Sequence, residues 1–153
     1  MKYTKLDTIE ALKKSGIMRG DTVFFTTSLG MLGVPDIKKI NSINDICLFI
    51  FNSIKKVLGP NGTIPVPTYS YSFGNVYKNK LPVFDPLKAH SKIGPFPNFF
   101  RKQNGVIRSA DPMVSIAGLG PNVKKILENV SSTSYGKDCV FERILKIKNA
   151  KCC

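Results

Sequence analysis

The sequence predicts an α/β fold in which a mostly parallel or mixed central sheet is flanked by helices in three layers (α/β/α). Helical and strand-like segments alternate along the chain, which is typical of this class. The composition is that of a globular domain, with 42% hydrophobic and 22% charged residues. The length of 153 residues suits one domain, so we expect a single α/β domain over residues 1–153.

The first elements are a helix and a buried strand. Asp7 followed three residues later by Glu10 has the pattern of a capping box, which predicts a helix that begins there and ends near Gly16. Residues 22–27 are β-branched and aromatic, and this short run predicts a buried strand. A glycine-rich loop follows at residues 28–33.

The strongest periodic signal covers residues 42–58. Apolar side chains recur there at spacings of one and three residues, which places them on one face of a core helix. Ser42 with Asp45 suits the helix start, and Gly59-Pro60 supplies a left-handed glycine and a proline at its end. The following strand at residues 63–67 contains two prolines, so we expect it near a sheet edge or interrupted at its end.

The remaining chain begins with a long segment without periodicity. Residues 68–97 are rich in Pro, Tyr, Ser and Lys, which predicts a substrate or cofactor loop. The patterns after it predict a helix at 98–102, a strand at 114–117, helices at 121–129 and 140–146, and the first residues of a strand at 150–153. A parallel strand is stable only inside a covered sheet, so we expect a truncated fold that is completed by another chain or a dimer, or is a marginal fragment.

Several classes of protein are excluded by the sequence. No run approaches the roughly 18 apolar residues of a spanning helix, and the N-terminus lacks the apolar region of a signal peptide, so we expect a cytoplasmic protein without a membrane partner. The spacing of Cys47, Cys139, Cys152 and Cys153 suits neither a metal site nor a disulfide framework. We predict no metal, and Cys47 is expected to act as a small core hydrophobe.

The net charge of +13 raises nucleic-acid binding as a function. The lysines are scattered in pairs that are typical of solvated helix faces, and no recognised nucleic-acid-binding module is present. We therefore keep nucleic-acid binding as the least favoured function.

Ordered motifs between residues 20 and 120 carry a family resemblance. They are Gly20-Asp21-Thr22-Val23 with Thr27-Ser28-Leu29, then Gly59-Pro60-Asn61-Gly62-Thr63 with Pro67-Thr68-Tyr69-Ser70, and then Phe84-Asp85-Pro86 with Gly105-Val106-Ile107-Arg108-Ser109-Ala110-Asp111-Pro112. In order and spacing the chain resembles the N-terminal half of the aminoglycoside 3-N-acetyltransferase (antibiotic N-acetyltransferase) family. The longer C-terminal part of that family, with a histidine- and carboxylate-bearing segment implicated in catalysis, is absent from these residues.

The resemblance implies acetyl transfer from acetyl-CoA to an amine of an amino sugar or aminoglycoside. This chemistry needs an anion site, donors for the developing oxyanion, and a base. Thr27, Ser28 and Leu29 could present N–H groups and hydroxyls to pantetheine or pyrophosphate, and Arg108 could pair with a phosphate. The same resemblance assigns further residues to the acetyl-CoA side: Thr68, Tyr69, Ser70, Ser109 and Ser115.

Most of these residues also have a purely structural interpretation. Thr27 and Ser28 could satisfy a strand end or cap a turn, and residues 68–70 could be ordinary polar loop residues. Arg108 could form a surface ion pair, and Ser115 could be a strand hydroxyl. His90 is the only histidine, but it does not match a family position and is expected on the surface.

Two positions depart from the family pattern. Thr26 and Asp111 stand where the family has histidines. We keep Asp111 as the candidate catalytic residue, because a carboxylate can orient an amine or hold an ammonium, although it is a weak base unless burial raises its pKa. Together with the basic residues Lys78 and Lys80, this change suggests a nucleotide-linked or surface-glycan amino sugar as the acceptor, rather than a drug.

A function of another class is also open. The chain could be a catalytically incomplete CoA-binding fragment that offers the acetyl-CoA side of a site and needs a partner chain, or a homo-oligomer, to complete it. In that case the catalytic base lies elsewhere.

Overall fold

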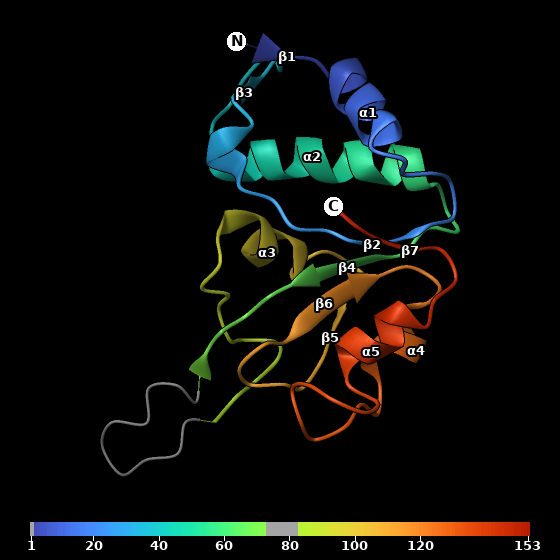
Figure 1. The fold of residues 1–153 in the computed structure, drawn as a ribbon. Helices are drawn as coiled ribbons and strands as arrows, with labels where there is room; N and C mark the ends of the chain where they lie inside the picture. Colours follow the sequence, from blue (N-terminus) through green and yellow to red (C-terminus); the bar gives the residue numbers. More distant parts are fainter. Residues whose placement is uncertain (1, 73–82) are drawn as a thin grey trace.

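The computed structural model describes residues 2–72 and 83–153 (Figure 1). The elements are, in order, β1 Lys2–Tyr3, α1 Lys5–Lys14, β2 Thr22–Phe24, the 3-10 turn η1 Leu29–Met31, β3 Val34–Pro35, α2 Ile43–Leu58, β4 Ile64–Pro67, α3 Pro95–Phe100, β5 Ile107–Arg108, β6 Ile116–Leu119, α4 Val123–Leu127, α5 Val140–Leu145 and β7 Ala150–Cys152. The predicted loop at 68–97 falls partly outside the described residues, as do Lys78 and Lys80.

The central sheet is mixed, with the strand order β7-β2-β4-β6-β5. β7 pairs in parallel with β2, and β6 pairs antiparallel with both β4 and β5. β2 and β4 are joined in parallel at Thr22 and Thr63, and the N–H groups of Val23 and Phe25 donate to the carbonyls of Thr63 and Pro65. The predicted mixed sheet is confirmed.

The prolines of β4 lie in an internal strand. The predicted location near an edge is wrong, because β4 is flanked by β2 and β6; the strand ends at Pro67, and the N–H of the next residue, Thr68, still donates to the carbonyl of Ser115. Pro65 and Pro67 have no N–H, so they cannot return hydrogen bonds to β2. The ladder between β2 and β4 therefore consists of bonds donated largely from the β2 side.

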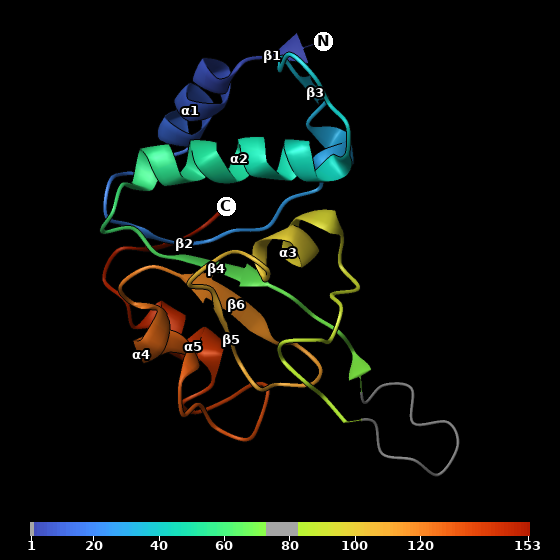
Figure 2. The ribbon, with the colours of Figure 1, turned by 180° about the vertical axis from the view of Figure 1, so that it is seen from behind.

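Helices cover both faces of the sheet (Figures 1 and 2). Successive side chains of β2 point to opposite faces. Val23 and Phe25 join a core cluster with α2 and α3, whereas Phe24 packs against the cluster formed by β6, α4 and α5. The predicted three-layer architecture is confirmed, with α1, α2 and α3 on one side and α4 and α5 on the other.

The two long helices are capped as local chemistry requires, although one start differs from the prediction. α2 begins after Ser42, which forms a capping box with Asp45, and Gly59 ends it with φ 68° and ψ −172°, a conformation open mainly to glycine. In α1 the cap is Thr4: its Oγ1 accepts from the N–H of Asp7, whose carboxylate accepts from the N–H of Thr4. The predicted cap at Asp7 is therefore wrong by one turn.

The other boundaries shift by a few residues. β2 is shorter than predicted, β6 lies two residues later, and α4 and α5 are shorter at their ends. α3 begins earlier, at Pro95, because proline at the first helical position already has a helical φ. The two-residue strands β1, β3 and β5 were not predicted, since such short segments carry no periodicity. Within the described ranges, no helix is long and apolar enough to cross a membrane.

Candidate functional site

The residues predicted to form a site lie at one edge of the sheet. β7, β2, β4 and β5 run in the same direction, and β6 runs against them. Residues 27–29 therefore follow β2, residues 68–70 follow β4, residues 108–109 end β5, and Ser115 precedes β6 at the same edge. We call it the carboxyl edge, and ligands of open α/β sheets bind at such an edge.

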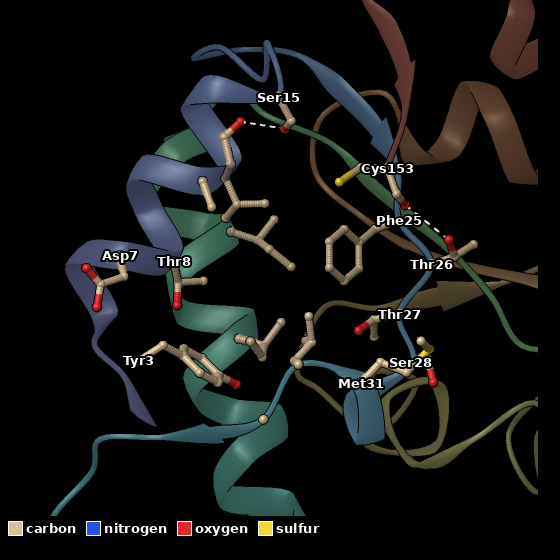
Figure 3. Close-up of a pocket in the computed structure, with 16 residues that line it drawn as sticks. Tyr3, Asp7, Thr8, Ser15, Phe25, Thr26, Thr27, Ser28, Met31 and Cys153 are labelled. Atoms are coloured by element: carbon tan, nitrogen blue, oxygen red, sulfur yellow. Dashed lines mark hydrogen bonds between the residues drawn. The ribbon is translucent and has the colours of Figure 1, made fainter. Parts of the chain in front are cut away.

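A large cavity opens where the strand order reverses. The chain runs from β2 to β4 on one side, whereas β7 returns to the other side of β2. This reversal is the topological switch point at which α/β proteins bind ligands. A cavity of about 800 Å³, which we call the first cavity, lies there between the end of β2, α1 and α2 (Figure 3). Its lining includes Thr26, Thr27, Ser28 and Cys153.

The segment after β2 faces this cavity with polar side chains. Thr26 is tied to β7, since its N–H and its Oγ1 both donate to the carbonyl of Cys153. Ser28 is exposed and precedes η1, but its side chain makes no capping hydrogen bond. Thr27 is partly exposed, whereas the side chain of Leu29 is buried in the core. Ser28 is therefore not a simple cap, and Leu29 can offer a ligand only its backbone.

A second cavity lies on the other side of the same segment. It has a volume of about 390 Å³ and is lined by residues 25–28 together with Val66, Pro67, Ile93, Phe96 and Pro97. The segment after β2 thus borders both cavities. Its threonine and serine residues line both cavities.

Arg108 is directed into the protein rather than toward solvent. Its guanidinium donates to Ser115 Oγ at 3.1 Å and to the carbonyls of Pro86, Ala89 and Thr68, and it lies 5.2 Å from the centre of the Phe84 ring. Burial, and then the charge of Arg101, lowers its pKa to about 10, so it is charged at neutral pH. These bonds use most of its N–H groups, and a phosphate would have to displace carbonyl partners.

The predicted surface ion pair of Arg108 is not formed. Its partners among the described residues are carbonyls, a hydroxyl and an aromatic ring, and none is a carboxylate. The side chain therefore clamps the segment around Pro86 and Ala89 against the ends of β4 and β6.

Four predicted hydroxyl residues support this clamp and are buried. Thr68 Oγ1 donates to the carbonyl of Ser115, and Ser115 Oγ lies 3.1 Å from the carbonyl of Thr68. Ser70 donates to the carbonyl of Pro112, and Ser109 Oγ accepts from the N–H of Ile116. These hydroxyls hold the ends of β4, β5 and β6 together, so they are structural groups behind the carboxyl edge.

Tyr69 and Asp111 lie on the face covered by α4 and α5. Burial raises the pKa of Tyr69 to about 12, with smaller contributions from Tyr135, Tyr71 and Asp111. Asp111 is partly exposed, and its Oδ1 accepts from the N–H groups of Met113 and Val114. It also borders a third cavity, of about 460 Å³. The structure thus brings the predicted residues to one edge but divides them between two faces of the sheet.

Some cavity residues carry no signal in the sequence. Tyr3, Thr8 and Leu12 line the first cavity from β1 and α1, and only the packing of α1 on α2 brings them there. His90 is exposed, as predicted. Cys47 is fully buried, and burial raises the pKa of its thiol to about 11, which confirms its role as a core hydrophobe. Within residues 2–72 and 83–153, no three His, Cys, Asp or Glu side chains are placed to hold a metal ion.

Comparison with known structures shows the same fold. The aminoglycoside acetyltransferase AAC(3)-Xa superimposes with a TM-score of 0.78 at 23% identity, over 94% of this chain and 53% of that one. AAC-IIIb in binary complex with CoASH has a TM-score of 0.77 at 20% identity, over 94% and 56%. AAC-VIa with bound sisomicin has a TM-score of 0.78 at 22% identity, over 95% and 57%. The chain spans about half the length of these proteins.

Family assignment follows from the sequence match. No curated protein matches the chain. The family model for aminoglycoside 3-N-acetyltransferase matches residues 36–153, which include α2, every strand of the central sheet after β2, and the predicted residues from Thr68 to Ser115. The chain therefore belongs to the aminoglycoside 3-N-acetyltransferase family.

Proposed function

We propose that this chain binds acetyl-CoA at the carboxyl edge, as part of an N-acetyltransferase that acts on an amine of an amino sugar. The observation that carries the proposal is the family match over residues 36–153, which contains the ends of β4, β5, β6 and β7 at this edge; residues 27–29 after β2 precede the matched range. Two proteins of the same fold support it: AAC-IIIb binds CoASH and AAC-VIa binds sisomicin.

The first cavity fits the pantetheine arm of the donor. Its volume of about 800 Å³ lies in the range of small-molecule sites. Most of its wall is apolar, with Leu12, Ile50 and Ile54 among the lining residues, and the hydroxyls of Thr27 and Ser28 stand at one end. Such a wall suits a ligand in which methylene groups alternate with amides, because the amides need a few hydrogen-bonding partners.

In the reaction, the acceptor nitrogen forms a bond to the acetyl carbon, the carbon–sulfur bond breaks, and the nitrogen loses a proton to a base. Thr27 and Ser28 would hold the donor at the edge, where backbone N–H groups after β2 can stabilise developing negative charge. Arg108 would keep the strand ends in place through its four hydrogen bonds. Asp111 already accepts two backbone hydrogen bonds, so we assign it to binding an ammonium rather than to removing a proton.

Calorimetry with CoA and acetyl-CoA tests donor binding by the full chain. Mass spectrometry of acetylated products, over amino sugars and 2-deoxystreptamine aminoglycosides, tests the transfer. Binding with turnover supports the enzyme. If the chain binds CoA but turnover appears only when a second chain is added, the chain is a catalytically incomplete CoA-binding fragment. Absence of CoA binding contradicts the proposal.

Nucleic-acid binding has one supporting observation. Exposed lysines gather at the ends of α1 and α2 and just before β7, at the edge opposite the carboxyl edge; they are Lys13, Lys14, Lys55, Lys56 and Lys148. A gel shift that weakens steeply with salt would support this function, because phosphate contacts release counterions. Absence of a gel shift would contradict nucleic-acid binding.

A further inference from the structure

The third cavity, of about 460 Å³, has no role in the donor site described above. It lies at the carboxyl edge on the face covered by α4 and α5, between residues 110–114 and the loop after α4. We call residues 131–134 the serine loop, since its sequence is Ser-Ser-Thr-Ser. The apolar part of the wall includes Val140 and Phe141 of α5, together with Val130, Met113 and Val114.

The polar groups around this cavity have free hydrogen-bonding capacity. Both backbone bonds of Asp111 are made to Oδ1, which leaves Oδ2 without a hydrogen bond among the described residues. Within the serine loop, the internal bonds use the hydroxyls of Ser131 and Thr133, and not those of Ser132 and Ser134. One carboxylate oxygen, two hydroxyls and an apolar wall match a ring that carries one ammonium and several hydroxyls.

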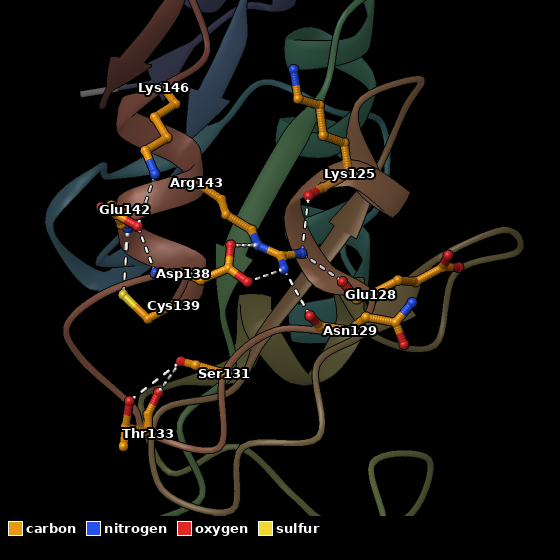
Figure 4. A network of polar contacts seen from close by, with 10 residues as sticks. All are labelled: Lys125, Glu128, Asn129, Ser131, Thr133, Asp138, Cys139, Glu142, Arg143 and Lys146. Carbon is orange, nitrogen blue, oxygen red and sulfur yellow. Dashed lines mark hydrogen bonds and ion pairs between the residues drawn. The ribbon is translucent and has the colours of Figure 1, made fainter.

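The loop that carries these hydroxyls is fixed at both ends by Arg143 (Figure 4). The guanidinium donates to both carboxylate oxygens of Asp138, at 2.8 and 2.7 Å, and to the carbonyl of Asn129 at 2.7 Å. It also donates to the carbonyls of Lys125 and Glu128 at the end of α4. One side chain therefore joins the two ends of the loop.

The backbone at both ends of the loop is in an unusual conformation. Asn129 has φ 51° and Asp138 has φ 64°, which non-glycine residues adopt rarely. Such residues persist where the surrounding structure holds them. A loop fixed in this way loses little further freedom when a ligand binds, which favours affinity.

We propose that the third cavity binds an amino-sugar ring of the acceptor, with its ammonium on Asp111 Oδ2 and its hydroxyls on Ser132 and Ser134. This inference rests on the proposed function, to which it adds the acceptor side. The first and third cavities lie on opposite faces of the sheet, so the ammonium held here is a second amine and not the one that is acetylated. Asp111 is a positioning residue for the acceptor.

Nuclear magnetic resonance of the full chain with D-glucosamine tests the site directly. Glucosamine is expected to shift the amide signals of residues 131–134, and D-glucose, which lacks the ammonium, to shift them far less. Asp111→Asn keeps the oxygen that holds the turn but removes the charge, so glucosamine affinity is expected to fall about tenfold. Equal affinity for glucosamine in this variant and in the unmodified chain, or shifts outside the loop, would overturn the inference.

Asp85→Asn is the matched control, because Asp85 also accepts from backbone N–H groups, those of Leu87 and Lys88, at the same edge. It should leave glucosamine binding unchanged. The double variant Ser132→Ala with Ser134→Ala should weaken glucosamine a few-fold without changing the fold. CoA titrations separate the two proposals: a chain that binds glucosamine at the serine loop but not CoA contradicts only the proposed donor site.

Discussion

Two parts of the carboxyl edge were grouped by the family resemblance but differ in structure. The segment after β2 is open: Thr27 and Ser28 border two cavities, and Ser28 has no capping bond. At the ends of β4, β5 and β6, by contrast, Thr68 and Ser115 are fully buried, and Arg108 is bonded to both. The motifs of the resemblance therefore include residues that border cavities and residues that hold the ends of the neighbouring strands together.

The largest effect is expected from Arg108→Met. Methionine has similar length but leaves the carbonyls of Thr68, Pro86 and Ala89 without their donor. Because buried carbonyls without partners are costly, the free energy of unfolding should fall by on the order of 3 kcal/mol in urea denaturation. Arg108→Lys keeps the charge but not the planar fork and should lose about half as much. Unchanged stability with lost CoA affinity would instead show that Arg108 contacts the donor phosphates.

A smaller loss of stability is expected from Ser115→Ala. The hydroxyl accepts from Arg108 Nε and bonds to the carbonyl of Thr68, so its removal should lower the free energy of unfolding by about 1–2 kcal/mol. Thermal and urea denaturation measure it. If Ser115→Ala costs more free energy of CoA binding than free energy of unfolding, Ser115 belongs to the open, ligand-facing part of the site.

The open part should respond in the opposite way. Thr27→Val and Ser28→Ala are expected to change the free energy of unfolding by no more than about 0.5 kcal/mol, as is usual for exposed positions without structural bonds. CoA affinity, measured by calorimetry, should weaken several-fold in each variant. If stability falls and affinity does not, the distinction between the two parts of the edge is wrong.

The smallest effect concerns alkaline pH. Burial raises the pKa of Tyr69 from 10.0 to about 12, so the folded chain holds this proton more tightly than the unfolded chain. Its contribution to stability is fully present below pH 10 and is lost as the pH rises through about 12. Tyr69→Phe should reduce the alkaline loss of stability, measured by denaturation between these pH values. Tyr135→Phe should reduce the alkaline loss much less, because Tyr135 is exposed and contributes less than burial to the raised pKa of Tyr69.

The long elements of the fold could be predicted because their signals are local. α2 combines a capping box at Ser42 and Asp45, an apolar face and Gly59, all within one stretch of chain. β1, β3 and β5 could not be predicted, since two residues carry no period. The cap of α1 was misplaced because Thr4 and Asp7 form the same motif one turn earlier than Asp7 and Glu10.

The site was predictable only as a set of segments. Motif order placed Thr27, Thr68, Arg108 and Ser115 together, and the strand directions confirm that they share an edge. Their division into open and buried groups depends on contacts between residues far apart in the chain, such as Arg108 with the carbonyl of Thr68. The serine loop and its anchor Arg143 carried no recognisable motif at all.

The sequence by itself determined the family, the main helices and the mixed α/β class, because motif spacing and hydrophobic period are properties of neighbouring residues. Only the tertiary structure decided that two prolines occupy an internal strand, that Arg108 is a clamp, and that Asp111 faces a cavity on the opposite side of the sheet from Thr27. A side chain's role depends on which distant carbonyls and cavities packing brings to it, and that is settled only when the layers assemble.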